Sequence, residues 1–596
     1  MNIRSLNILS LVLSAALLLA GCQGHDDAES QTQPTDILSY FGTDGKAWLS
    51  LEISLPEPQG TTRANSFDDG TTADQAINSL MLVLFHGAAG TAEADLRVAS
   101  IYHIGYSRED DDHSQVTHHS QQTFQISSTG ISSNDQLFLL AIANATPEIT
   151  VGQTFSEVAA TQSAYTTTVS GTAYYVMSNS PLTSANDGTG AVTTLEPVDP
   201  TRFAASAAAA TLPACQLFLE RLACKVTATT ATALDLHVQG NAYIDFTTSD
   251  LKYAVDNYND NSYLVRHFQP TWLPYQAAGK GLRMIEQTAL TTERYRTYWA
   301  EDINYTGKSG LQRAHSGWTA LGVDSYCAEN TFDVARQQDD CTTGVLFTLR
   351  LNGGSDFYTT SVTGSDVIYQ APQSDLTEEG TGADQSFAPR RSTYVSSAKP
   401  INQYLREWLW ETNKDFRDWV NQYAAGEVKQ VNITLETYTS GQQNALVATV
   451  TQKARSGGDG ATAFNSLNLV DYLNNNINIK YYYQGYCYYR VPIRHFNDDE
   501  TPWTPAAATN SNSTSQVYGS GTTAETAYLG RYGMVRNNHY IVEISAVNHI
   551  GEPVIMSLTT AADDSVEQLL NATLQISGWE AHDQNLVRGE TNRVKK

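Results

Sequence analysis

The feature that most constrains this chain is a short stretch in which apolar and polar residues alternate. Leu49, Leu51, Ile53 and Leu55 are separated by single polar residues. Side chains of a β-strand point alternately to opposite faces, so this period predicts a strand with one buried face. Breakers and small polar residues follow over residues 56–70, and we expect that segment to be exposed.

Composition extends the β-sheet prediction to the whole chain. The 596 residues include 32 Tyr and 40 Gly, and only 17% are charged, which is typical of extracellular β-sheet rather than helical bundles. A length of this size allows two to four domains. The fold class that we expect is therefore mainly β, with a small helical content.

Further elements are predicted from apolar runs bounded by turn-forming residues. The local residue composition changes near residues 240–261, which indicates a boundary between a domain over 64–245 and a second over 246–596. One helix is predicted over 401–423, because its apolar residues lie near a single face. The other predicted strands are 77–85, 136–144, 173–177, 215–230 and 540–547.

The N-terminus predicts export. Arg4 precedes an apolar run over residues 8–19, and Leu-Ala-Gly stands directly before Cys22. A basic start, a short apolar core and small residues make a secretory signal, too short for a membrane-spanning helix. The last four of these residues resemble a bacterial lipobox, which implies a signal peptide over 1–21 and acyl chains on Cys22. A cleaved signal with a chance cysteine is the alternative.

Charge and motifs limit the function classes. With 36 Lys+Arg and 63 Asp+Glu the net charge is −27, so nucleic acid is not expected as a partner. We found no Gly-x-Ser-x-Gly, His-Glu-x-x-His or Cys-x-x-Cys motif, so no enzyme, cofactor or metal site is expected. The acidic and histidine-rich run 109–119 is better explained as a solvated loop than as a cation site. Packing is likewise preferred to sugar stacking for the tyrosine-rich run 481–489.

The cysteines leave an odd number after lipidation. With Cys22 acylated, five remain, so at least one thiol stays free or pairs between chains. Cys327 and Cys341 are the predicted disulfide, which would close a polar loop in an oxidising compartment. Cys215 and Cys224 lie in an apolar segment and are equally well explained as core residues.

Several phrases in order along the chain resemble the shaft subunits of Bacteroidales type V fimbriae. The resemblance is to the minor-fimbria (Mfa-like) branch and more distantly to the major fimbrillin, and it implies two tandem antiparallel β-sandwich domains of transthyretin-like type. An insert over 505–523 and an extra Asn538 depart from the family pattern. The phrases are Leu217-Phe-Leu-Glu-Arg-Leu-Ala-Cys-Lys-Val, Tyr295-Arg-Thr-Tyr-Trp, Tyr326-Cys-Ala-Glu-Asn-Thr, Gly485-Tyr-Cys-Tyr-Tyr-Arg-Val-Pro-Ile-Arg-His and Tyr532-Gly-Met-Val-Arg-Asn-Asn-His-Tyr.

The resemblance also implies how such a subunit assembles. An arginine-specific protease would cut between Arg63 and Ala64, releasing a lipidated propeptide over 22–63 together with the strand at 47–55. A segment of another subunit would then fill the vacated place by β-augmentation. The C-terminal part of the second domain resembles the donor strand of the family. We expect the donor contacts at Leu574, Ile576, Trp579, Leu586 and Val587.

The function implied is that of a structural subunit of surface fimbriae that mediates adhesion. Its partners would be other copies of itself, accessory fimbrial subunits, the arginine-specific protease, and host or bacterial surface ligands. The lipid would hold the precursor at the outer membrane before it joins an extracellular fimbrium. The alternatives are a tip or accessory fimbrial adhesin and a lipid-anchored surface glycan-binding protein.

Overall fold

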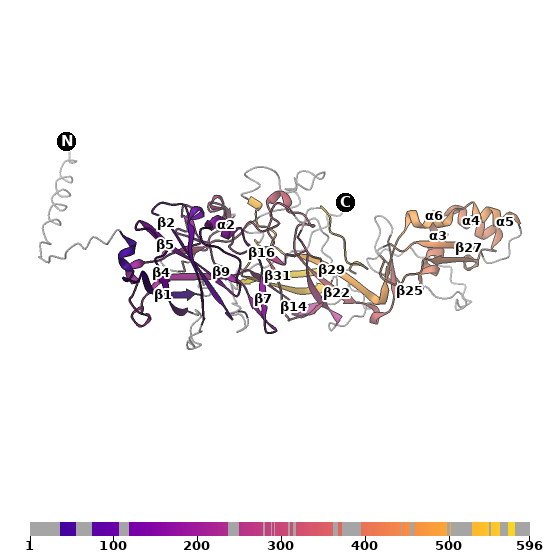
Figure 1. Ribbon diagram of the computed structural model, residues 1–596. Helices are drawn as coiled ribbons and strands as arrows, with labels where there is room; N and C mark the ends of the chain where they lie inside the picture. Colours follow the sequence, from indigo (N-terminus) through magenta and orange to yellow (C-terminus); the bar gives the residue numbers. More distant parts are fainter. Residues whose placement is uncertain are drawn as a thin grey trace, which may run out of the picture.

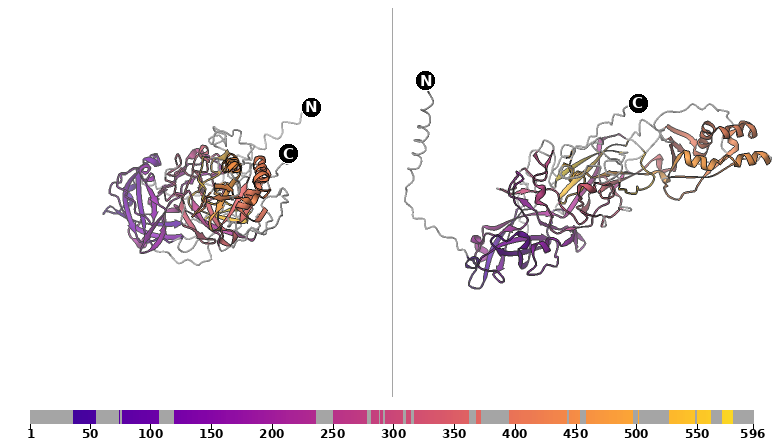
Figure 2. Two further views of the ribbon diagram at one scale, coloured as in Figure 1. Left: turned by 90° about the vertical axis from the view of Figure 1, so that its right-hand side faces the viewer. Right: turned by 90° about the horizontal axis from the view of Figure 1, so that it is seen from above.

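The computed structural model of the protein is elongated, with the N-terminal strands at one end and a group of helices at the other (Figures 1 and 2). Strands dominate, so the chain is mainly β, as predicted. The described residues are 36–54, 74, 76–106, 119–235, 250–277, 281–287, 289–290, 293–307, 310–313, 317–361, 368–371, 395–442, 444–452, 458–496, 501, 527–547, 550–560 and 570–578. Within them, no helix is long and apolar enough to cross a bilayer.

The N-terminal sheet contains eight strands. Its hydrogen-bonded order is β3-β2-β5-β9-β13-β1-β4, and β12 pairs with β5. The strands are β1 (Lys46–Ser54), β2 (Leu80–Ala88), β3 (Arg97–Ile104), β4 (His119–Ser127), β5 (Asp135–Ala143), β9 (Met177–Asn179), β12 (Glu196–Pro197) and β13 (Pro213–Arg221).

Burial on both faces explains why β2 is apolar without alternation. Leu80 and Leu82 point into one core with Leu49 of β1, whereas Met81 and Val83 belong to a second core on the opposite face. A strand covered on both sides reads as a continuous apolar run. The first core takes side chains from both halves of the sheet, so β1 and β4 pack over β2 and β5.

The central sandwich consists of two four-stranded sheets with one shared core. Val226 and Tyr540 come from one sheet, Phe347 and Tyr489 from the other, and all four belong to one buried cluster. The first sheet has the order β21-β14-β30-β31 and the second β20-β15-β22-β29. The strands are β14 (Ala223–Asp235), β15 (Lys252–Asp256), β20 (Thr319–Ala320), β21 (Ser325–Ala328), β22 (Gly344–Arg350), β29 (Tyr486–Pro492), β30 (Asn538–Val547) and β31 (Leu570–Gly578).

A third core forms the end of the molecule opposite β1 (Figure 1). We call residues 358–481 the distal module. It is inserted between β22 and β29, which pair antiparallel. Its elements are β23 (Phe357–Ser361), β24 (Ile368–Ala371), β25 (Val395–Pro400), α3 (Ile401–Thr412), α4 (Lys414–Tyr423), η11 (Val428–Gln430), β26 (Val431–Leu435), β27 (Val447–Gln452), α5 (Gly458–Asn465), α6 (Leu469–Asn476) and β28 (Asn478–Tyr482).

Short elements complete the described chain. They connect the N-terminal sheet and the central sandwich or lie at their edges. They are η1 (Ile37–Tyr40), η2 (Glu93–Asp95), α2 (Phe155–Ala159), β6 (Gln162–Ala164), β7 (Thr166–Val169), β8 (Thr172–Tyr175), β10 (Leu182–Thr183), β11 (Val192–Thr193), η3 (Pro200–Arg202), η4 (Ala207–Ala209), β16 (Asn261–Tyr263), η7 (Pro270–Trp272), β17 (Gln276–Ala277), β18 (Gly281–Leu282), β19 (Tyr295–Arg296), η8 (Val334–Arg336), η9 (Asn352–Gly354) and η12 (Tyr483–Gly485).

Three local predictions differ from the structure. The strand predicted over 215–230 is two strands, because the chain passes from the N-terminal sheet to the central sandwich at Leu222, well before the boundary expected at 245. The helix predicted over 401–423 is two helices, and the Asn413 side chain caps the second by accepting a bond from the Phe416 amide. The range 246–596 contains two separate large cores, of which the helical one was not expected.

Candidate assembly site

The predicted displaceable strand is β1, and it lies inside the sheet. It runs parallel to β13 on one side and antiparallel to β4 on the other. Among the described residues β4 has no other strand partner. Removal of β1 would therefore leave two unpaired strand edges at once, one on each side of the vacated slot.

Four side chains of β1 fill the first core. Ala47, Leu49, Leu51 and Ile53 are 0 to 2% exposed and pack with residues of β2, β5 and β13. Full burial of a Leu or Ile side chain contributes about 1.5 to 3 kcal/mol, so the three larger ones contribute roughly 5 to 9 kcal/mol before ordering costs. Leu55, the fourth predicted apolar residue, lies outside the described residues.

The opposite face of β1 makes polar contacts with its neighbours. Ser50 Oγ accepts a hydrogen bond of 2.7 Å from Gln121 Nε2 of β4. Trp48 exchanges two backbone hydrogen bonds of 2.8 Å with Ala204, which fixes the start of the strand. The slot is thus shaped on one face by apolar contacts and along both edges by backbone pairing.

The segment that would be cut follows β1 directly. Cys22, Arg63 and Ala64 lie outside the described residues, so the structure adds nothing to their predicted roles. The described chain stops at Ser54 and resumes at Asp74. These two residues therefore mark the fixed ends of the segment that contains the predicted cleavage site.

Asp74 anchors the chain just after that segment. Its side chain is almost completely buried; Tyr326 Oη donates to Oδ1 at 3.0 Å and Lys225 Nζ lies 3.5 Å from Oδ2. Its carbonyl accepts a bond of 2.7 Å from Arg221 Nε. Because Lys225 and Tyr326 belong to the central sandwich, this anchor holds the chain at the junction with the N-terminal sheet. Sequence reasoning missed it, since the partners are far apart along the chain.

The predicted donor residues fall partly within β31. Leu574 pairs with Val542 and Ile576 with Tyr540 of β30, so β31 is the edge strand of its own sheet. Trp579, Leu586 and Val587 lie outside the described residues. The sequence Leu574-Gln-Ile-Ser577 has the same apolar and polar order as Leu51-Glu-Ile-Ser54 of β1.

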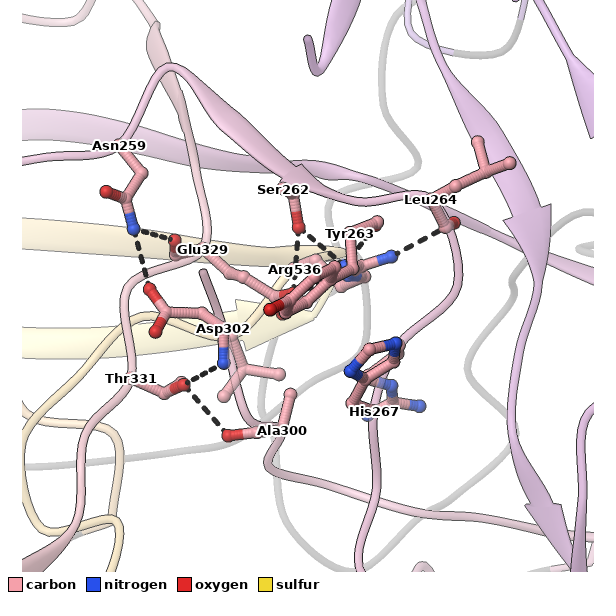
Figure 3. A network of polar contacts seen from close by, with 12 residues as sticks. Asn259, Ser262, Tyr263, Leu264, His267, Ala300, Asp302, Glu329, Thr331 and Arg536 are labelled. Carbon is pink, nitrogen blue, oxygen red and sulfur yellow. Dashed lines mark hydrogen bonds and ion pairs between the residues drawn. The ribbon is translucent and has the colours of Figure 1, made fainter. Parts of the chain in front are cut away.

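A buried polar network joins the N-terminal part of the molecule to the central sandwich near the same junction (Figure 3). Arg536, which precedes β30, donates from Nε to Glu329 Oε1 at 3.0 Å and from Nη2 to the Tyr263 carbonyl at 2.7 Å. Ser262 Oγ donates to the same Glu329 oxygen at 2.8 Å. Ser262 and Tyr263 belong to β16, which pairs with β6, so the network ties the central sandwich to an element of the N-terminal part.

Burial and pairing set the charges in this network. Burial opposes ionisation of both members of the pair, but their mutual attraction prevails: Arg536 lowers the pKa of Glu329, and Glu329 raises the pKa of Arg536. Burial and the nearby Glu329 raise the pKa of Asp302 well above its ordinary value, which disfavours ionisation of this carboxyl group. Asp302 Oδ2 accepts a bond of 2.6 Å from Asn259 Nδ2. The network therefore places a buried ion pair beside a carboxyl group whose ionisation is disfavoured.

The structure corrects the predicted disulfide. Cys327 and Cys341 are both buried and are not joined. Cys327 stands directly opposite Cys224 across β21 and β14, whereas Cys341 packs with Phe332 and Tyr532 in a separate small cluster. The prediction failed because strand pairing, not spacing along the chain, decides which thiols meet.

Two weaker candidate sites remain, the acidic and histidine-rich run 109–119 and the tyrosine-rich run 481–489. No group of three metal-ligating side chains occurs within the described ranges, and most of the run 109–119 lies outside them. In the tyrosine-rich run, Tyr481, Tyr482 and Tyr489 are buried, while Tyr486 and Tyr488 are half-buried. This run is therefore mainly core, as alternation on a strand requires.

Comparison with known proteins identifies the C-terminal region. Residues 480–585, which include β29, β30 and β31, match the family model described as major fimbrial subunit protein type IV, fimbrillin, C-terminal. This C-terminal region is similar to the fimbrillin family. It matches no curated protein.

Solved structures of similar extent are also known. A candidate cell adhesion protein from Parabacteroides distasonis shares 11% identity with this chain; the match covers 90% of this chain and 99% of that protein, with a TM-score of 0.33. One from Bacteroides eggerthii shares 10% identity over 90% and 98%, with a TM-score of 0.33. The C-terminally truncated tip fimbrial protein Mfa3 from Porphyromonas gingivalis shares 10% identity over 89% and 100%, with a TM-score of 0.27.

Proposed function

We propose that this chain is a structural subunit of a surface fimbria that polymerises by exchange of the strand β1. The precursor would be exported as a lipoprotein through Cys22, reach the outer membrane, and be cut between Arg63 and Ala64. The cut would turn β1 into a separate peptide held only by non-covalent contacts. The observation that carries the proposal is the position of β1, an inner strand that buries its apolar side chains and stands immediately before the cut segment.

The pattern of β31 supports its role as the replacement. A strand that fills the slot must bring apolar side chains at every second position and must run parallel to β13. Leu570, Ala572, Leu574 and Ile576 alternate with polar residues in the way that Ala47, Leu49, Leu51 and Ile53 do. A strand taken from one subunit and inserted in the next makes a head-to-tail contact, which propagates as a filament.

Cleavage of the purified precursor with an arginine-specific protease tests this mechanism. The expected result is a ladder of oligomers on an unheated denaturing gel and loss of residues 1–63 from each subunit. Arg63→Ala should remain uncut there and monomeric. The matched control is Arg417→Ala in α4 of the distal module, at the end of the molecule remote from β1 (Figure 1), which should still form the ladder. Monomer alone after complete cleavage would refute strand exchange.

A synthetic peptide separates the donor assignment from the cleavage step. A labelled peptide of residues 568–580 should bind the cut chain and not the uncut chain. The same peptide with Leu574 and Ile576 replaced by Asp should not bind, because these substitutions place charges in an apolar core. Equal binding of both peptides would contradict β31 as the donor.

The distal module favours a second candidate, a tip or accessory adhesin. It is a separately cored insertion at the end of the molecule remote from β1, where it is free of the proposed joint (Figure 1). In this case the subunit would accept a strand, and the module would contact the host or bacterial surface. Electron microscopy of filaments labelled against the module distinguishes the roles: label along the length indicates a shaft subunit, and label at one end indicates a tip subunit.

A further inference from the structure

A short extended segment connects the two sheets of the central sandwich between β30 and β31. We call residues 550–560 the strap. It begins in the central core, where Ile550 is buried. It then reaches β29, which is the edge strand of the sheet β20-β15-β22-β29. The strap therefore leaves the sheet that contains β30 and β31 and crosses to the opposite one.

The first part of the strap is bound to β29 and β28. The Glu552 amide donates to the Tyr488 carbonyl at 2.9 Å, and the Tyr488 amide donates to the Glu552 carbonyl at 2.8 Å. Lys480 Nζ donates to both oxygens of the Glu552 carboxylate at 2.8 Å. Tyr482 Oη donates to the Gly551 carbonyl at 2.9 Å. Backbone and side-chain bonds thus hold Glu552 at the same place.

The second part of the strap is bound to two loops. Arg313 Nη2 donates to the Met556 carbonyl at 2.9 Å, while Arg313 Nε pairs with a buried carboxylate of β15 at 2.7 Å. The Thr559 amide donates to Asp339 Oδ2 at 3.2 Å, and the Asp340 amide donates to the Thr559 carbonyl at 3.0 Å. None of the strap's partners named here, all of them described residues, belongs to β30 or β31. The strap is therefore attached to the subunit independently of the strands that it connects.

The strand β31 is attached in a different way. It is the edge strand of its sheet, and its backbone ladder is formed with β30. Within the described sheets, removal of β31 breaks this ladder and no other strand pairing. The strand can therefore leave β30 while the bonds of the strap stay intact.

We propose that the strap is the fixed root of the donor strand. When β31 moves into the next subunit, residues 550–560 keep their contacts, so the arm that is given away begins at residue 561. The inference rests on the proposed function, because it takes β31 as the donor. It adds the point from which the donor leaves its own subunit.

A fixed root limits the distance between joined subunits. Residues 561–569 separate the strap from Leu570, the first residue of β31. An extended chain covers at most about 3.3 to 3.6 Å for each residue, so Leu570 lies within roughly 35 Å of Thr560. The slot that one subunit offers must therefore come within this distance of the strap of its neighbour.

Hydrogen exchange in the uncut chain tests whether the strap and β31 are separate units. Glu552→Gln removes the charge that Lys480 contacts, and loss of a partly exposed ion pair should make local opening roughly 2- to 5-fold more frequent. Peptides covering 551–560 should exchange faster by this factor, and those covering β31 should not change. The matched control is Glu427→Gln, which removes an exposed carboxylate 3.9 Å from Lys429 and should change neither segment. Equal acceleration of β31 and the strap in Glu552→Gln would overturn the proposal, because the two would then open together.

A comparison of the uncut chain with the ladder formed after cleavage tests the root itself. Backbone groups alternate in direction along a strand, so every second amide of β30 loses its partner when β31 leaves. We expect faster exchange in β30 of the ladder and unchanged exchange over 551–560.

The ways in which this comparison can fail are distinguishable. Faster exchange over 551–560 in the ladder would overturn the fixed root, because the arm would then begin before the strap. A ladder in which β30 stays protected would refute β31 as the donor, and the absence of any ladder would refute strand exchange. In both of these cases the proposed function fails first, and the root fails with it.

Discussion

Shortening Leu51 to alanine provides a direct measure of how firmly β1 is held. The Leu51 side chain is fully buried between the two halves of the N-terminal sheet. Leu-to-Ala changes at such positions remove transfer free energy and leave a cavity, which together cost about 3 to 5 kcal/mol. With about 1.4 kcal/mol for each factor of ten, opening of β1 should become roughly 100- to 4000-fold more frequent.

Hydrogen exchange followed by mass spectrometry measures this opening separately for each segment of the chain. The uncut chain is used, so that β1 stays attached and only its stability changes. Amides of β1 and of its partner β4 should lose protection, while those of α4 in the distal module should not change. The control is Glu52→Gln, because Glu52 lies on the opposite face of β1, where Gln216 Nε2 contacts it at 3.4 Å. Unchanged protection of β1 in Leu51→Ala would refute the view that this face holds the strand.

Three further predictions concern other parts of the molecule. Arg536→Met leaves the buried Glu329 carboxyl group without its partner, so thermal unfolding should show a loss of about 3 to 5 kcal/mol, partly recovered when Glu329→Leu is added; equal loss in both variants would contradict a paired charge. Burial raises the pKa of Glu196 from 4.5 to about 7 despite the nearby Arg294. The folded state therefore binds this proton more tightly, and urea unfolding should show stability falling by on the order of 3 kcal/mol as pH rises from 4.5 to 7.5, with a smaller fall in Glu196→Gln. Replacement of residues 359–480 by Asn-Gly should leave strand exchange intact but abolish surface adhesion, and loss of the oligomer ladder would show that the module is needed for assembly.

The alternating stretch gave the most accurate sequence prediction. The strand expected over 47–55 is observed as Lys46–Ser54, because a period of two over several residues specifies both a strand and its buried face. The apolar run over 215–230 was less informative. It contains no breaker, so nothing in it predicts that Leu222 leaves one sheet for the next.

Long-range partners account for most of what the sequence did not predict. Glu329 and Arg536 are individually ordinary residues, and only the meeting of β16, β21 and β30 gives them a partner. The same holds for Asp74 at the junction and for Cys327, which meets a cysteine in another strand. The distal module was not predicted for a related reason. β22 and β29 are neighbours in the sheet, although the residues of the whole module lie between them in the sequence.

The way in which the distal module joins the sandwich has an evolutionary consequence. It enters at Phe357 and leaves at Tyr482, register partners whose rings stack with centroids 4.3 Å apart. The chain therefore enters and leaves the module at neighbouring positions, and the module core is separate from the sandwich core. Recombination at these two neighbouring positions exchanges the whole module without disturbing the remainder of the subunit.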